Sequence, residues 1–386
     1  MGTGREKWDF ETFTHPRFLG DSWMWWREFL DGKADKTRRN YIKSFMDFLE
    51  VEDYTTETLF EEHRDNSKHD DPRHKKRLGS KVYRYQKMIM DEGKSSGSAD
   101  NVAIAIKSFF RANEMDFRTN GNIKVISEEI PTIGNEELKL ILDVCGSVRL
   151  KAGIHVLKES GMRISDLCQI KVSDIEEALT GDLDFFTWTF IQQKTGRRAD
   201  PVIGGEAIRW LKFWITKREL DGIESEWVFC TVQSNDDNQR IRGRIAPASI
   251  GQLFRHYRDK AGLRDTGVSI HSLRKRHKTL LEYSGIPTSW INKMQGRVGQ
   301  GTGGAYTKPN PEQLIEMYKR GYEELTIEDY SSKDEQLAEM KELRTDVEDL
   351  KETLRAIQAV GGLVEGSSTA SIFENVRDSR EKREKK

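Results

Sequence analysis

The pattern of apolar and polar residues in the first third of the chain has the period of α-helices. Apolar side chains recur every three or four residues there, which is the spacing of one helix face. The stretches with this spacing carry Trp23, Trp26, Phe29 and Leu30, then Tyr41, Phe45, Phe48 and Leu49, and last Val102, Ile106 and Phe109. We therefore predict a helical domain over residues 1–118, whose last helix begins at a Ser98 cap. The charged run at 64–77, RDNSKHDDPRHKKR, is predicted to be a solvated loop.

The pattern changes twice after this domain. Residues 119–134 contain turn-forming glycines and a proline without a sustained period, which is typical of a linker, and we place the domain boundary near residue 130. Helical spacing returns in NEELKLILDVCG, whereas DFFTWTFIQQKTGRRADPVI has aromatic and β-branched residues around a polar turn, as in a β-hairpin. Residues 135–330 are thus predicted to form a second domain. The fold class is mainly α with a small antiparallel β-sheet, an α+β arrangement.

The C-terminal segment has a third pattern. Apolar residues follow one another at spacings of 3, 4, 3, 4 and 3 among charged residues, at Met340, Leu343, Val347, Leu350, Leu354 and Ile357. This is a heptad seam, so residues 331–360 are predicted to form a coiled-coil-like helix that packs against its own chain or a neighbouring subunit. Gly361 and Gly362 end it, and residues 361–386 have the polar, charged composition of a disordered tail.

Composition and charge narrow the classes of function. Among 386 residues, 63 are Lys or Arg and 64 are Asp or Glu, so the net charge is −1 with 33% charged residues. The neutral total conceals a basic middle, because residues 190–300 hold 20 Lys and Arg against 11 Asp and Glu. No apolar run reaches the roughly 18 residues of a membrane span, and the N-terminus has no signal-peptide core, so we expect a cytoplasmic protein. The scattered Cys145, Cys168 and Cys230 predict neither a disulfide nor a zinc site.

Two short segments of the second domain carry isolated basic residues. In ESGMRISDLCQIKVSDI, Gly161 can close one helix and Ser165 can cap the next, which places Arg163 at the junction. In FIQQKTGRRADPVI, Lys194 lies at the predicted hairpin tip. Taken alone, the first is an ordinary surface arginine and the second an ordinary basic turn.

Two later segments add further cations and a tyrosine. SIHSLRKRHKTLLEYSG predicts an amphipathic helix on which His271, Arg274 and Lys278 share a stripe at i, i+3 and i+7, suited to binding phosphate. In INKMQGRVGQGTGGAYTKP, Arg297 precedes Tyr306 by nine residues across a glycine-rich stretch. That stretch has no following Gly-Lys-Ser/Thr, so it does not predict a nucleotide site.

The order of these residues resembles the tyrosine recombinases and phage-type integrases. GMRISDL looks like the first arginine box of that family, and HSLRKRHKTLLEYSG looks like its second, helical box. The spacing from INKMQGR to Tyr306 is similar to the family spacing before the nucleophile. Arg297 stands where most members carry His or Trp, and the sequence QGR is similar to integrases of archaeal viruses and plasmids. The helical domain at 1–118 resembles, by its position, the DNA core-binding domain of the family.

The resemblance implies a site-specific DNA recombinase that cleaves and rejoins strands through a 3′-phosphotyrosyl bond. It assigns the nucleophile to Tyr306 and the general acid to Lys194, and it implies neither a metal nor ATP as cofactor. Arg163, His271, Arg274 and Arg297 suit the remaining task, because an attacked phosphodiester gathers negative charge that fixed cations can meet. The implied partners are double-stranded DNA at specific sites and, on two such sites, a homotetramer built from free monomers or dimers.

Other readings of the same residues stay open. A type IB topoisomerase would use the same nucleophilic chemistry, and an inactive DNA-binding relative would keep the cations. A helical interaction protein would carry the basic stripe as ordinary surface and act through its heptad segment. His277 falls near the apolar face of its helix and is predicted to be a packed histidine.

Overall fold

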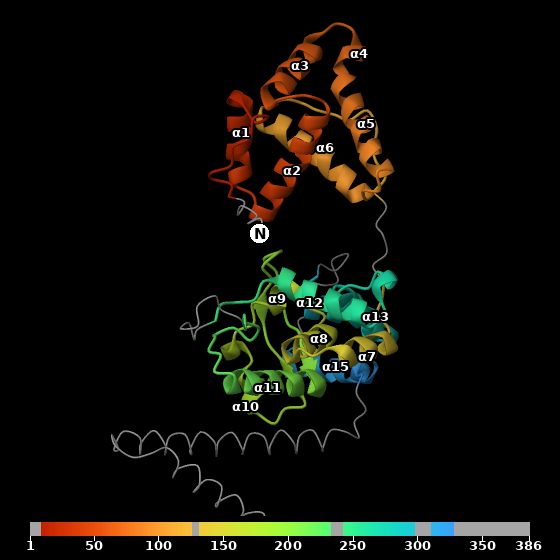
Figure 1. Ribbon diagram of the computed structural model, residues 1–386. Coiled ribbons are helices and arrows are strands. Elements are labelled where there is room, and N and C mark those ends of the chain that lie inside the picture. Colours follow the sequence, from red (N-terminus) through yellow and green to blue (C-terminus); the bar gives the residue numbers. More distant parts are fainter. Residues whose placement is uncertain (1–8, 126–130, 233–241, 298–309, 328–386) are drawn as a thin grey trace, which may run out of the picture. The chain divides into compact units, whose positions relative to one another are not determined.

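The computed structural model describes residues 9–125, 131–232, 242–297 and 310–327, and the chain divides into two compact units, Met1–Glu129 and Ile130–Lys386 (Figure 1). Tyr306 and the predicted heptad helix lie outside the described residues. Within those residues no helix has the length and apolar character needed to cross a membrane.

The regular structure in the described part of the first unit is all helical, and non-helical segments precede and follow the helices. Its helices are α1 (Gly20–Asp31), α2 (Asp35–Val51), α3 (Thr56–Lys68), α4 (Pro72–Lys75), α5 (Arg77–Asp91) and α6 (Ser96–Ala112). The apolar faces predicted from the sequence meet in one core, in which Trp26, Phe45 and Phe109 are fully buried. The aromatic rings of this core pack mainly edge to face, as Trp26 does on Phe45 with ring centroids 5.1 Å apart.

Two local predictions in this unit are wrong. The run at 64–77 is mostly helical rather than a loop, because α3 continues to Lys68 and Asp71 caps α4 by accepting a hydrogen bond from the Arg73 N–H. Its charged side chains are nevertheless largely exposed. The cap of helix α6 lies three residues before the predicted Ser98, because Ser95 is the capping residue and its side chain accepts from the Ser98 N–H.

The second unit is mainly helical and contains two short antiparallel strand pairs, which confirms the predicted fold class. Its described helices are α7 (Asn135–Val144), α8 (Val148–Ser160), α9 (Ile164–Leu167), α10 (Glu176–Thr180), α11 (Gly205–Leu220), α12 (Pro247–Lys260), α13 (Ser272–Tyr283), α14 (Thr288–Gln295) and α15 (Pro311–Leu325), with 3-10 turns at Val172–Asp174 and Arg264–Thr266. Helix α8 is central and packs against α11, α12, α13 and α15 (Figure 1). Its residues from Ala152 to Ser160 are all buried.

The strands form one extended hairpin around the predicted turn. Strand β1 (Phe185–Thr187) pairs with β4 (Val202–Gly204), and β2 (Phe190–Ile191) pairs with β3 (Arg198–Ala199) in the register Phe190 opposite Ala199. The turn between β2 and β3 holds Lys194 at an exposed position. Because β3 contacts α14, the hairpin is docked on the helical part of the unit.

Candidate active site

Arg163 lies where α8 ends and α9 begins. Gly161 closes α8 in the left-handed conformation, with φ of 61°, as predicted. Arg163 is itself the residue at the N-terminal boundary of α9, so the expected Ser165 cap is wrong. One guanidinium nitrogen of Arg163 is 3.9 Å from a carboxylate oxygen of the buried Asp166. The Asp166 carboxylate therefore helps to hold the Arg163 guanidinium where α8 meets α9.

Arg274 is the most completely enclosed cation of the set. Its two terminal nitrogens donate to the carbonyl oxygens of Gly161, at 2.7 Å, and Gln295, at 2.9 Å. Burial and the neighbouring Arg297 and Arg163 together lower the pKa of Arg274 to about 9. The guanidinium remains charged at neutral pH and is fixed in orientation by two backbone acceptors.

His271 and Arg297 complete the group around Arg274. Desolvation of the ring lowers the pKa of His271, and Arg274, Arg297, Arg163 and Lys194 all act on it in the same direction. Burial lowers the pKa of Arg297, and Arg163 adds to the effect. These five predicted side chains, from four separate segments, therefore share one electrostatic neighbourhood. Mutual repulsion of this kind favours binding of an anion between them.

The hairpin that carries Lys194 is tied to the arginines by hydrogen bonds at its base. The Gln192 side chain donates to the Gln295 carbonyl at 2.6 Å, so Gln192 and Arg274 share that acceptor. The Gln193 N–H donates to the Asp166 carboxylate at 3.3 Å. Farther along, Lys293 pairs with Asp200 at 2.8 Å. The tip itself is exposed, so Lys194 projects from an anchored base.

Asp166 and Gln295 are positioning residues that the sequence analysis does not identify. Asp166 contacts both Arg163 and the Gln193 N–H, and burial raises the pKa of its carboxyl. The Gln295 amide donates to the Arg274 carbonyl at 3.2 Å and to Nδ1 of His277 at 2.8 Å. The signal available for Asp166 was its spacing of three residues from Arg163. The sequence gives no signal for Gln295, because it is its backbone carbonyl that accepts from Arg274 and Gln192.

Two other members of the basic helix have structural roles. His277 is fully buried, which confirms the predicted packed histidine, and burial lowers its pKa to about 3. Lys278 is 3.6 Å from Glu282 one turn later on α13. Lys278 is predicted to share a phosphate-binding stripe with His271 and Arg274, but in the structure it forms an i,i+4 ion pair with Glu282.

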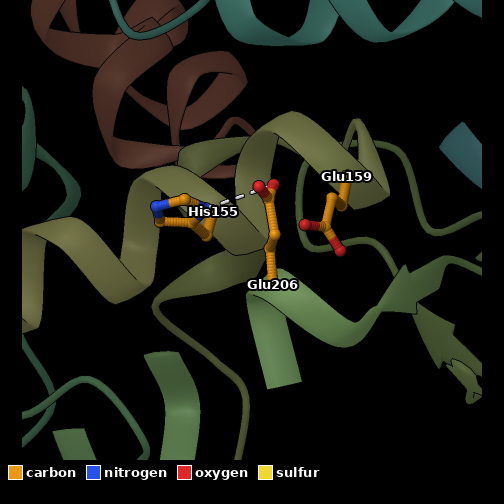
Figure 2. Close-up of side chains that lie close together, drawn as sticks. All are labelled: His155, Glu159 and Glu206. Carbon is orange, nitrogen blue, oxygen red and sulfur yellow. Dashed lines mark ion pairs between the residues drawn. The ribbon is translucent and has the colours of Figure 1, made fainter. Parts of the chain in front are cut away.

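A second cluster of titratable groups lies in the core of the unit. His155 and Glu159 on α8 converge with Glu206 on α11 closely enough to hold a metal ion, and His155 is 3.8 Å from Glu206 (Figure 2). The ammonium of Lys158 already lies between the carboxylates, 2.9 Å from Glu159 and 2.5 Å from Glu206. The lysine supplies the cation that these carboxylates need, so the donor set does not fit a metal.

The same cluster holds the end of α15. Lys158 donates to the Leu325 carbonyl at 3.0 Å, and the Ile327 N–H donates to Glu206 at 2.9 Å. On the neighbouring α13, the buried Arg276 donates to the Glu324 carbonyl at 3.2 Å. We call Lys158, Glu206 and Arg276 the α15 anchor. These three charged side chains hold the C-terminal end of α15 in place.

Comparison with known proteins adds family relationships to this geometry. Residues 131–313 match the model described as "Phage integrase family". The "Tyrosine recombinase XerA" of Thermococcus onnurineus is 25% identical over 241 residues, which cover 60% of this chain and 77% of that protein. The "Tyrosine recombinase XerC" of Proteus mirabilis is 28% identical over 192 residues, which cover 50% of this chain and 56% of that protein.

Among solved structures, a lambda integrase tetramer bound to a Holliday junction aligns with a TM-score of 0.50 at 18% identity, over 74% of this chain and 76% of that one. A lambda integrase dimer bound to a COC′ core site gives a TM-score of 0.50 at 17% identity, over 75% and 79% of the two chains. These likenesses show a shared fold.

Proposed function

We propose that this chain, whose residues 131–313 belong to the phage integrase family, is a site-specific DNA recombinase that cleaves and rejoins strands through a phosphotyrosyl bond. The observation that carries the proposal is the convergence of Arg163, Lys194, Arg274 and Arg297 on His271, with Arg163 and Arg297 also acting on the enclosed Arg274. The carboxylate of Asp166 offsets only one of these four cations, so an anion bound between them is stabilised. A DNA phosphodiester supplies it.

The chemistry assigned to each group follows from its environment. The Tyr306 oxygen attacks the scissile phosphorus, the new bond from tyrosine to phosphorus forms, and the bond from phosphorus to the 5′ oxygen breaks. Arg163, Arg274 and Arg297 offset the charge that builds on the non-bridging oxygens. His271, whose lowered pKa favours the neutral ring, can accept the tyrosyl proton. Lys194 gives a proton to the departing 5′ oxygen.

The rejoining step reverses these roles. The 5′ hydroxyl of a second strand attacks the phosphotyrosine and returns its proton to Lys194, while Tyr306 recovers a proton as it leaves. The bond energy stays in the phosphotyrosine between the two steps, so the proposal needs neither ATP nor a metal. Exchange between two sites requires four such centres, and we propose a homotetramer on two duplexes.

The exposed cations of the first unit support a DNA-binding role for residues 1–118. Arg73, Lys75, Lys76 and Arg77 follow one another at the junction of α4 and α5, all exposed. Such a surface suits phosphate contacts, whose contribution to affinity falls with rising salt.

The predicted arrangement of linker 119–134, catalytic domain 135–330 and heptad helix 331–360 belongs to the same proposal. An enzyme that recombines chromosomal or plasmid DNA would act in the cytoplasm.

The test is a covalent adduct on nicked duplexes taken from the DNA that flanks the gene of this chain. A nick beside the cleavage point lets a short strand diffuse away, so the phosphotyrosine accumulates. We expect a protein–DNA adduct in which peptide mapping locates the linked nucleotide on Tyr306. The Tyr306→Phe variant should bind the duplex but form no adduct. Tyr283→Phe is the matched control, because Tyr283 is 83% exposed and lies at the opposite end of α13 from His271 and Arg274.

Three outcomes contradict parts of the proposal. An adduct that survives in Tyr306→Phe moves the nucleophile to another residue. DNA binding without any adduct, under conditions that retain binding, would identify an inactive relative. Relaxation of a supercoiled plasmid without exchange between two sites would indicate a type IB topoisomerase instead.

A further inference from the structure

Gln192 is a buried polar residue beside the exposed turn that carries Lys194. It is 1% exposed, although the next two residues, Gln193 and Lys194, are exposed. Burying an amide is costly unless its polar atoms have hydrogen-bond partners. Both polar atoms of this side chain have one, because the oxygen accepts from the Thr195 hydroxyl at 2.8 Å and the nitrogen donates to the Gln295 carbonyl at 2.6 Å. The amide therefore joins the turn to the end of α14.

The backbone of Gln192 closes the same turn. Its N–H donates to the Arg197 carbonyl at 2.8 Å, and its carbonyl accepts from the Gly196 N–H at 2.9 Å. Lys194 lies inside the loop that these bonds close, two residues after Gln192. A single residue thus fixes the shape of the turn and ties it to the helical part of the unit.

The acceptor of the Gln192 amide is also an acceptor of the central arginine. Arg274 donates to the same Gln295 carbonyl at 2.9 Å. The next residue, Gly296, permits this close approach, because a Cβ atom there would lie 2.5 Å from the Gln192 amide nitrogen. The Lys194 turn and the Arg274 guanidinium are therefore both held against one carbonyl oxygen.

A second attachment fixes the base of the hairpin, farther from the turn. The Asp200 carboxylate accepts from the Thr189 hydroxyl at 2.6 Å, and the Asp200 N–H donates to the Lys293 carbonyl at 3.2 Å. Burial raises the pKa of this carboxyl, but hydrogen bonds from Lys293, Thr189 and Arg198 outweigh burial and leave the pKa below its usual value. The charged carboxylate thus joins the base of the hairpin to α14. With the base fixed, the place of the turn depends on Gln192.

We propose that Gln192 is a positioning residue for the proton transfer from Lys194. It holds the Lys194 turn against the carbonyl that orients Arg274, so that the ammonium reaches the 5′ oxygen of the phosphodiester that the arginine binds. Lys194 gives its proton to that oxygen as the bond from phosphorus to the 5′ oxygen breaks, and Gln192 itself gives and accepts no proton. This inference rests on the proposed function and deepens it by naming the group that sets the place of the general acid.

A substrate that needs no acid tests this role. Once the adduct of the unchanged chain has located the scissile phosphate, a second nicked duplex is made with sulfur in place of the bridging 5′ oxygen. A thiolate leaves without a proton, so a misplaced Lys194 slows the reaction of the oxygen substrate alone. The full chain with Gln192→Met should form the adduct on the oxygen substrate roughly a hundredfold more slowly, which is the cost of a misplaced catalytic group. On the sulfur substrate its rate should be nearly that of the unchanged chain, and Lys194→Ala should show the same selectivity.

Gln86→Met is the matched control for the loss of a buried amide. Gln86 is 2% exposed in the first unit and donates to the Ala99 carbonyl at 2.9 Å. The change therefore removes a comparable hydrogen bond from the core of the other unit. It should leave the ratio of the two rates unchanged, whatever its effect on stability.

Gly296→Ala displaces the Gln192 amide while keeping the glutamine. Gly296 has φ of 60°, and the added Cβ would also lie 2.9 Å from the Cβ of Ala199 on the hairpin. This variant should again slow the oxygen substrate more than the sulfur substrate, and it decides the question if Gln192→Met does not fold. Gly285→Ala is its control, because Gly285 has φ of 77° and an added Cβ there meets nothing within 4 Å.

The outcomes separate this inference from the proposed function. Equal slowing of both substrates by Gln192→Met, or slowing of neither, would overturn the positioning role. If Lys194→Ala is selective and Gln192→Met is not, the general acid stands and this inference alone fails. Equal slowing of both substrates by Lys194→Ala would remove the general acid from the proposed function. DNA binding by the unchanged chain without any adduct would overturn the recombinase, and this inference with it.

Discussion

Two glycines with nearly the same positive φ offer a controlled test of how the candidate active site is packed. Gly161 has φ of 61° and Gly196 has φ of 62°. A Cβ atom on Gly161 would lie 2.5 Å from the Gln295 amide nitrogen and 2.6 Å from Nδ1 of His277. A Cβ atom on Gly196 would meet nothing within 4 Å. Substitution by alanine therefore adds the same backbone strain at both positions and a steric clash at only one.

The expected losses follow from these two contributions. The left-handed conformation costs a residue with a Cβ about 1–2 kcal/mol, which is the whole expected loss of unfolding free energy for Gly196→Ala. Gly161→Ala adds overpacking of about 1–3 kcal/mol, which brings its total to about 2–5 kcal/mol. The clash also pushes on Gln295, whose carbonyl and amide both contact Arg274. We therefore expect strand cleavage to fall in Gly161→Ala by more than the loss of folded protein explains.

Urea unfolding of both full-length variants, followed by circular dichroism, measures the difference. Adduct formation is then compared without urea, at a temperature at which both variants are folded. Equal losses of stability for the two variants would refute the assignment of a clash at Gly161. Normal cleavage by folded Gly161→Ala would refute the link from this glycine through Gln295 to Arg274.

Three further predictions concern charged groups. Asp166→Asn keeps the shape of the side chain but removes the carboxylate beside Arg163, so cleavage should fall roughly tenfold at unchanged DNA affinity in a filter-binding assay; unchanged cleavage would count against the positioning role. Lys158→Met leaves two buried carboxylates without their cation and should cost about 3–5 kcal/mol of unfolding free energy, against at most about 1 kcal/mol for the exposed control Lys319→Met. Because the pKa of His277 is about 3 in the folded chain and near 6.5 when unfolded, the unfolded state takes up a proton first as pH falls. Stability should therefore fall between pH 6.5 and 3 by about 1.4 kcal/mol per pH unit for this group, and His277→Leu should flatten the slope by that amount; an unchanged slope would contradict the buried neutral ring.

Much of the site is predictable because its residue types and spacing follow from local structure. The Lys194 hairpin follows from aromatic and β-branched stretches on either side of a polar turn, and the helix that begins after His271 follows from its apolar period. The structure brings their side chains together with Arg163 and Arg297. The loop prediction for the run at 64–77 is wrong because Asp71 followed by Pro72 starts a helix there in spite of the high charge density.

What the sequence could not supply is the set of contacts that depend on tertiary packing. Gln295 acts through its carbonyl, and every residue has one, so no residue type indicates that Arg274 and Gln192 share it. The α15 anchor could not be predicted either, because its contacts also depend on tertiary packing. Lys158 looks like an exposed helix lysine until α11 and α15 enclose it.

The α15 anchor also makes the backbone after α15 part of the charge balance of the core. Its acceptors and donors reach backbone atoms of Leu325 and Ile327, so the peptide group after α15 is a structural partner rather than a free end. A chain cut at Leu325 would replace that neutral peptide with a terminal carboxylate close to Glu206 and Glu159, where Lys158 is already shared by two acids. Proteolysis or genetic shortening at this point would thus introduce a third negative charge into the core of the domain.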